Sequence, residues 1–129
     1  MTQVAVHSML EMFDCPQERL NDVEFAREVV REAAVAAGAT VLAEVAHRFE
    51  PQGVTAIAVL AESHLSVHTW PEYGYAAADV FTCGTTTDPE AACRLLADRF
   101  GAARHELKTL SRGPDVGDSP PAYSPITER

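Results

Sequence analysis

Side chains capable of chemistry are concentrated in one stretch, residues 60–84, with the sequence LAESHLSVHTWPEYGYAAADVFTCG. It brings hydroxyl, imidazole and thiol groups together, among them Ser63, His64, His68 and Cys83. A purely structural strand would favour Val and Ile at several of these positions. Local conflict between residue type and structural preference is expected at functional sites, so we look for the chemistry here.

Metal binding is the first chemistry to consider. His64 and His68 are four positions apart, a spacing that on a helix would place both imidazoles on one ion. Val67 and Thr69 favour a strand instead, and on a strand four residues span roughly 13 Å, too far for a shared ion. The sequence therefore predicts no metal site.

A serine hydrolase is the second possibility. Ser63 does not lie in a Gly-x-Ser-x-Gly turn, and the chain is short for an α/β-hydrolase. A nucleophile and its base must also lie within hydrogen-bond reach, which the spacing alone does not provide. This chemistry is disfavoured.

Self-processing is the third possibility. The Ser63 hydroxyl can attack the carbonyl of Glu62 and convert the peptide bond to an ester. Loss of the Cα proton then expels the Glu62 carboxylate and leaves dehydroalanine, which hydrolyses to a pyruvoyl group. Such a ketone condenses with a substrate amine and accepts electrons as CO₂ leaves, which is the role of PLP in other enzymes. Residue pattern alone does not choose between these possibilities.

The run ESHLSVHTWPEYGYAAADVFTCG resembles the signature of the prokaryotic S-adenosylmethionine decarboxylase proenzymes, the small self-cleaving type. The resemblance extends through FDCPQERLNDVEF, AAGATV, HRFEPQGV and the DPEAA segment, and it covers nearly everything up to about Gly113. It implies a two-layer α+β fold that dimerises with active sites between protomers. It also implies a self-generated pyruvoyl cofactor in place of PLP, and an aminopropyl donor for spermidine synthesis as the product.

The resemblance assigns roles to the reactive residues. Ser63 becomes the pyruvoyl precursor, and the bond between Glu62 and Ser63 is the one cleaved. His68 is expected to accept a proton during processing, and Cys83 to donate one during decarboxylation. Thr55 stands where the family commonly has a serine that assists processing, and it keeps the hydroxyl.

Substrate contacts are implied in the same way at Phe49 (adenine stacking), Leu65 (backbone contact) and Glu72 (ribose hydroxyls). The chain departs from the family pattern at four places: Thr55, Ala5-Val6 in place of a Gly-Arg pair before His7, Ala46 in place of an aromatic residue, and Glu44 in place of a small polar one. The last two bear on the pocket. Because the two share a strand face, they could reshape the pocket for a cationic amino acid. A pyruvoyl-dependent ornithine or arginine decarboxylase therefore stays open as an alternative, as does an uncleaved regulatory homologue.

Hydrophobic periodicity predicts strands over residues 4–13, 40–49, 54–61, 63–69, 75–83 and 105–110. Helices are predicted over residues 22–37 and from Pro89 onward, the second capped by Asp88. The uniformly apolar strand 54–61 is expected to be covered on both faces. The order βαβββαβ indicates a largely antiparallel sheet with both helices on one face, a two-layer α+β sandwich. A second copy of the chain is the simplest cover for the other face.

The five-residue link between strands 63–69 and 75–83 predicts that Thr69 lies opposite Tyr75 and Ser63 opposite Phe81. Cys83 would then be a diagonal neighbour of Ser63, roughly 7–8 Å away or less. His68 would lie roughly 16 Å along the strand from Ser63 and point to the opposite face. We therefore expect His68 to serve the Ser63 of the other subunit.

Composition limits the partners. The net charge of −9 disfavours nucleic acid and anionic membranes, and leaves a small-molecule amine as the expected substrate. No leader-like or membrane-spanning run is evident, and three cysteines without a Cys-x-x-Cys pair fit a reduced, cytoplasmic protein. We expect one domain over residues 1–113 and a flexible, proline-containing tail over 114–129.

Overall fold

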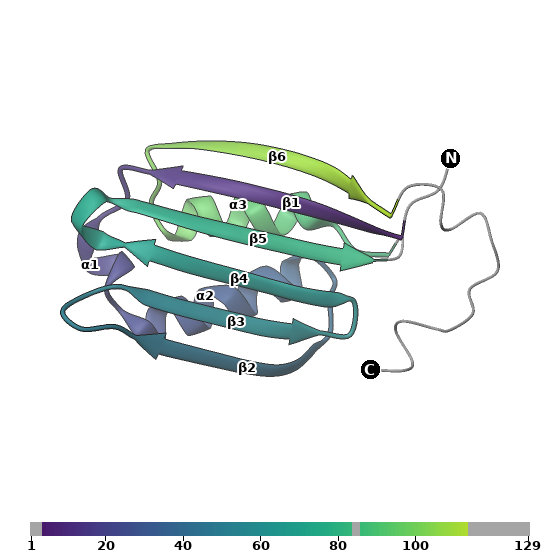
Figure 1. The fold of residues 1–129 in the computed structure, drawn as a ribbon, viewed down its shortest axis with the longest axis horizontal. Coiled ribbons are helices and arrows are strands. Elements are labelled where there is room, and N and C mark those ends of the chain that lie inside the picture. Colours follow the sequence, from purple (N-terminus) through teal and green to yellow (C-terminus); the bar gives the residue numbers. More distant parts are fainter. Residues whose placement is uncertain (1–3, 84–85, 114–129) are drawn as a thin grey trace.

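The structure, a computed structural model, describes residues 4–83 and 86–113 of the 129-residue chain. Within these ranges six strands form one sheet in the order β2-β3-β4-β5-β1-β6, with every neighbouring pair antiparallel. The two long helices lie behind one face of this sheet (Figure 1). The predicted two-layer α+β architecture is confirmed. The expected tail, 114–129, lies outside the described residues.

The predicted elements are all present with small shifts at their ends. The strands are β1 (Ala5–Phe13), β2 (Val41–Arg48), β3 (Val54–Leu60), β4 (Ser63–Trp70), β5 (Tyr75–Cys83) and β6 (Arg104–Arg112). The helices are α1 (Gln17–Leu20), α2 (Val23–Ala36) and α3 (Pro89–Arg99), with a 3₁₀ turn η1 (Pro71–Tyr73). Periodicity did not predict α1 or η1, because each is a single turn, too short to show a repeat.

Both long helices begin at side-chain caps, of which the Asp88 cap was predicted. The carboxylate of Asp22 accepts the N–H of Phe25 at 3.0 Å, and that of Asp88 accepts the N–H of Ala91 at 3.1 Å. Each bond satisfies a backbone donor that has no partner within the helix. The two caps fix where α2 and α3 start against the sheet.

The core lies between the helices and the inner face of the sheet. In the inner strands β1, β3, β4 and β5 alternate residues turn inward and are almost fully buried, and helix side chains pack against them. The largest of these side chains are Leu10, Met12, Leu65, Val67, Val80, Val29, Leu96 and Phe100. Burying each one stabilises the fold by roughly 1.5–3 kcal/mol.

The outer face of the sheet carries the other half of each strand. Val59 of β3 lies on it and is 47% exposed, so the expectation that β3 is covered on both faces does not hold within the single chain. Val45 on β2 and Leu110 on β6 are also exposed. The same face also carries polar side chains, among them His68 and Asp79, so it is a mixed surface with exposed apolar residues that a second layer could cover.

The predicted register between β4 and β5 is wrong by one residue. Trp70, not Thr69, lies opposite Tyr75, and Ser63 lies opposite Thr82, not Phe81. The reason is that β4 continues through Trp70, and η1 with Gly74 at φ +62° closes the link in four residues. A one-residue shift changes which side chains share a face. Phe81 therefore lies opposite His64, and the prediction that Cys83 is a diagonal neighbour of Ser63 on one face is also wrong.

Candidate functional site

Ser63 begins β4 directly after the two-residue link, Ala61 and Glu62, that joins it to β3. Its φ angle is +144°, a conformation that is essentially restricted to glycine. Holding a residue with a side chain there costs on the order of 1–3 kcal/mol. The strained backbone angle therefore belongs to Ser63, the residue at which the sequence predicts cleavage.

The carbonyl oxygen of Glu62 is held by the end of β5. The backbone N–H of Cys83 donates to it at 2.9 Å, and the Cys83 thiol donates to it at 3.1 Å. Two fixed donors on one carbonyl oxygen are what stabilises negative charge when a nucleophile adds to the carbonyl carbon. The carboxylate of Glu62 accepts the N–H of Thr40 at 3.1 Å, which anchors the link from the start of β2.

His64 lies beside this bond on the outer face. Its Nδ1 is 3.5 Å from the Ser63 hydroxyl, and its ring stacks on Phe81 with centroids 5.6 Å apart and planes 6° from parallel. Burial lowers the pKa of His64 below its usual value near 6.5. Sequence reasoning considered His64 only as a metal ligand. Its position next to Ser63 was the signal that was missed.

A second histidine, His7 on β1, lies on the other side of Phe81. The Nε2 of His7 is 2.9 Å from the Asp79 carboxylate, and the His7 ring contacts Phe81 with centroids 5.4 Å apart. The pair explains why Asp79 lies on a strand otherwise rich in small apolar residues.

The far end of β4 carries a separate group of residues. Thr55 and His68 face each other on β3 and β4, and the Thr55 hydroxyl is hydrogen-bonded to Nδ1 of His68 at 2.8 Å. Both line a pocket of about 380 Å³. Phe49, Gln52, Gly53, Val54, Thr69, Trp70 and Glu72 complete its lining. Four of the residues expected at the site, Phe49, Thr55, His68 and Glu72, are thus brought together here.

Ser63 and Cys83 are not part of that pocket. Five positions of an extended strand separate Ser63 from His68, a distance of roughly 16 Å. Leu65 also stays apart, because its side chain is fully buried on the helix side and only its backbone is available for a contact. Within one chain the predicted site residues form two groups at opposite ends of β4.

The two departures from the family pattern lie on the helix side of the sheet. Arg31 of α2 donates two hydrogen bonds to the carboxylate of Glu44, at 2.6 and 3.0 Å, and Ala46 packs against the core. Neither side chain lines the pocket around His68. The idea that Glu44 and Ala46 reshape that pocket for a cationic amino acid is therefore not supported.

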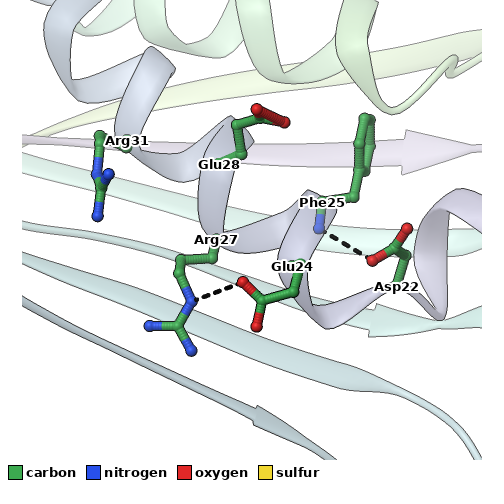
Figure 2. Close-up of a pocket in the computed structure, with 6 residues that line it drawn as sticks. All are labelled: Asp22, Glu24, Phe25, Arg27, Glu28 and Arg31. Carbon is green, nitrogen blue, oxygen red and sulfur yellow. Dashed lines mark hydrogen bonds and ion pairs between the residues drawn. The ribbon is translucent and has the colours of Figure 1, made fainter.

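A second hollow, of about 450 Å³, lies along the solvent side of α2 (Figure 2). Its charged side chains are engaged with one another or with the fold: Glu24 pairs with Arg27, and Asp22 caps the helix. It contains no nucleophile beside a base. We assign the chemistry to β4.

Over residues 4–83 and 86–113, no group of three or more His, Cys, Asp or Glu side chains is close enough to hold a metal ion. In the same ranges no helix combines the length and the apolar character needed to cross a membrane.

Comparison with known proteins decides the family. The model of the S-adenosylmethionine decarboxylase family matches residues 6–113. The chain is 58% identical over 109 residues to the S-adenosylmethionine decarboxylase proenzyme of Prochlorococcus marinus (strain MIT 9313), covering 84% of this chain and 87% of that protein. This chain belongs to the S-adenosylmethionine decarboxylase family.

More distant members of the family agree. The proenzyme of Pseudomonas aeruginosa (strain LESB58) is 47% identical over 105 residues, covering 81% of this chain and 66% of that protein. The crystal structure of the adenosylmethionine decarboxylase from Aquifex aeolicus VF5 superposes with a TM-score of 0.84 at 28% identity, over 94% of this chain and all of that one. Family membership and fold thus rest on independent matches of sequence and structure.

Proposed function

We propose that this chain cleaves its own backbone between Glu62 and Ser63 and then decarboxylates S-adenosylmethionine with the resulting pyruvoyl group. The observation that carries the proposal is the strained Ser63, which follows a carbonyl held by two donors from Cys83. The names of the relatives favour S-adenosylmethionine over ornithine or arginine as substrate. They also favour a processed enzyme over a non-catalytic homologue.

Cleavage starts when the Ser63 hydroxyl adds to the Glu62 carbonyl carbon. The negative charge that develops on the carbonyl oxygen meets the N–H and the thiol of Cys83, which already point at it. Breaking the C–N bond gives the ester and lets Ser63 leave its strained φ angle. Removal of the Ser63 Cα proton, which we assign to His68 of a second copy of the chain, then expels the Glu62 carboxylate.

The pyruvoyl group, when formed, supplies an electron sink for the loss of CO₂. The residues around position 63 suit this group. The Cys83 thiol is 3.1 Å from the carbonyl oxygen of Glu62, so it would lie close to the ketone formed at position 63. In this proposal Cys83 first stabilises the oxyanion during processing and later returns a proton to carbon. His68, held by Thr55, stays oriented by a hydrogen bond throughout.

The separation of the two groups on β4 supports a site built from two copies. A two-fold axis running across the strands, between two outer sheet faces, exchanges the ends of the sheet. The Ser63 end of one protomer then meets the Phe49–His68–Glu72 pocket of its partner. The exposed apolar side chains Val45, Val59 and Leu110 would be buried in the same contact.

Phe49 and Glu72 suit a nucleoside in this composite site. Phe49 is 46% exposed in the single chain and its ring meets that of His47 edge to face, so the exposed part of the ring suits stacking with an adenine. The carboxylate of Glu72 can accept hydrogen bonds from two ribose hydroxyls. We place the protein in the cytoplasm, where both the substrate and reduced cysteines are expected.

Two measurements test the function. Purified protein is assayed for CO₂ release from S-adenosylmethionine, L-ornithine and L-arginine, and we expect release from the first alone. Denaturing electrophoresis of the same sample should show fragments Met1–Glu62 and Ser63–Arg129. An intact chain without activity would instead support the regulatory homologue, and release from an amino acid would support the alternative substrates.

A further inference from the structure

We propose that His64 is the base that takes the hydroxyl proton of Ser63 when the backbone of its own chain is cleaved. This inference rests on the proposed self-cleavage and divides it between two histidines. His64 would act in the first step, from amide to ester. His68 of the partner copy would act in the second, on the Cα proton.

Geometry favours His64 for the first step. Its Nδ1 is 3.5 Å from the Ser63 hydroxyl, whereas His68 of the same chain lies roughly 16 Å along the strand. Hydrogen bonds used in catalysis are often long in the resting state and shorten as the reaction begins. No rearrangement of subunits is needed for this contact, since both residues are neighbours at the start of β4.

The imidazole is also held in one orientation. Phe81 lies directly opposite His64 on β5, and the two rings stack nearly parallel at 5.6 Å. Stacking fixes the ring plane and leaves Nδ1 directed at Ser63. In the tautomer that carries its proton on Nε2, Nδ1 is an acceptor and can take the hydroxyl proton.

Charged groups on the neighbouring strands determine how readily His64 accepts a proton. The Asp79 carboxylate of β5 favours the imidazolium, and His7 of β1 opposes it, while burial has the largest effect and opposes it too. Arg112 of β6 lies over Phe81 at 5.5 Å from the ring centroid and adds a positive charge nearby. The resting imidazole is therefore neutral near pH 7, as a base must be.

The conversion of the amide to the ester neither gains nor loses a proton overall. The Ser63 O–H proton moves to Nδ1 of His64 as the Oγ–C bond forms at the Glu62 carbonyl. When the C–N bond breaks, the imidazolium returns that proton to the departing nitrogen of Ser63. The products are an ester and an amine, His64 is neutral again, and no external reactant is consumed.

The test compares His64→Phe with His68→Ala by hydroxylamine treatment, which cuts an ester but not an amide. Phe keeps a flat ring against Phe81 and removes the nitrogen. We expect His64→Phe to slow loss of the amide about 100-fold or more, with no hydroxylamine-sensitive ester. His68→Ala should accumulate that ester. His105→Phe, on exposed β6, is the matched control and should cleave like the parent.

Two results would overturn the inference: parental cleavage kinetics in His64→Phe, or accumulation of the ester in that variant. If His64→Phe fails to fold by circular dichroism, His64→Ala is tested with added imidazole. Stimulation of cleavage by imidazole supports the base role, and a folded variant that imidazole leaves unchanged contradicts it. Failure of the parent chain to cleave at all would count against the proposed function itself, which keeps the two claims distinguishable.

Discussion

The two ends of strand β4 differ in what they hold. One end carries backbone strain at Ser63 and a carbonyl polarised by Cys83, and neither residue lines the pocket around His68. The other carries a pocket with an aromatic ring, a carboxylate and an oriented imidazole, but no strained bond. This difference supports the proposal that one copy of the chain supplies two half-sites and that a dimer completes them.

The largest effect is expected when the reacting hydroxyl of Ser63 is removed. Ser63→Ala should abolish both cleavage and decarboxylation, because the variant lacks the hydroxyl that attacks the Glu62 carbonyl and that is lost when the pyruvoyl group forms. Electrophoresis and CO₂ release measure the two losses. Ser8→Ala is the matched control: its buried hydroxyl has no hydrogen-bond partner among the described residues, so cleavage should be kept. Fragments in the Ser63→Ala variant would refute the assignment.

The division between copies is tested by mixing two inactive chains. Ser63→Ala and His68→Ala chains, co-expressed with different tags, should form heterodimers in which one composite site is intact. With random pairing, about half of the His68→Ala chains should then be cleaved. Cleavage no better than in the separate variants would mean that His68 serves its own chain.

Glu72→Gln changes the pocket around His68 and leaves the Ser63 end of β4 unaltered. We expect cleavage to proceed normally and kcat/KM for S-adenosylmethionine to fall roughly 10- to 100-fold, because hydrogen bonds to a charged acceptor contribute about 1.5–3 kcal/mol. Glu28→Gln, in the hollow along α2, is the matched control (Figure 2). An equal loss in both variants would contradict the choice of pocket.

The pH dependence of ester formation probes the strained end. Because burial lowers the pKa of His64 below 6.5, the base stays neutral at pH 7 and loses its acceptor only as pH falls through that lowered value. The rate of amide loss should be level from about pH 8 to about pH 6.5 and then drop up to about tenfold per pH unit. A decline that begins above pH 7 would argue against His64.

The smallest effect is expected from Glu44→Gln. Glu44 lies on the helix side and pairs with Arg31, so the change should lower Tm only slightly and leave the preference for S-adenosylmethionine unchanged. Thermal unfolding and the three-substrate assay measure the two quantities. A gain or loss of activity toward ornithine would show that this residue reaches the substrate after all.

Much of the architecture was predictable, because the periodicity of hydrophobic residues indicates which segments are strands and which are helices. Alternation in β1 and β5 and the 3.6-residue repeat of α2 mark which side chains face the core, and Asp22 and Asp88 mark where helices start. The register of β4 against β5 was not predictable to one residue. It depends on whether Trp70 belongs to the strand or to the turn, which the closure by Gly74 decides.

The details of the site were less accessible. The positive φ of Ser63 and the two donors on the Glu62 carbonyl depend on how a two-residue link meets the end of a distant strand, and residue types do not encode that geometry. Glu44 was misplaced because alternation gives two faces without saying which one the helices cover. The separation of Ser63 from His68, by contrast, followed from strand length alone.

The most direct test of the central claim is an intact-mass measurement on freshly purified, folded protein under denaturing conditions. The account predicts two polypeptides, Met1–Glu62 with a free carboxyl terminus and Ser63–Arg129 with a keto group in place of its first amino group. A single species at the full 13.9 kDa of the chain would contradict it.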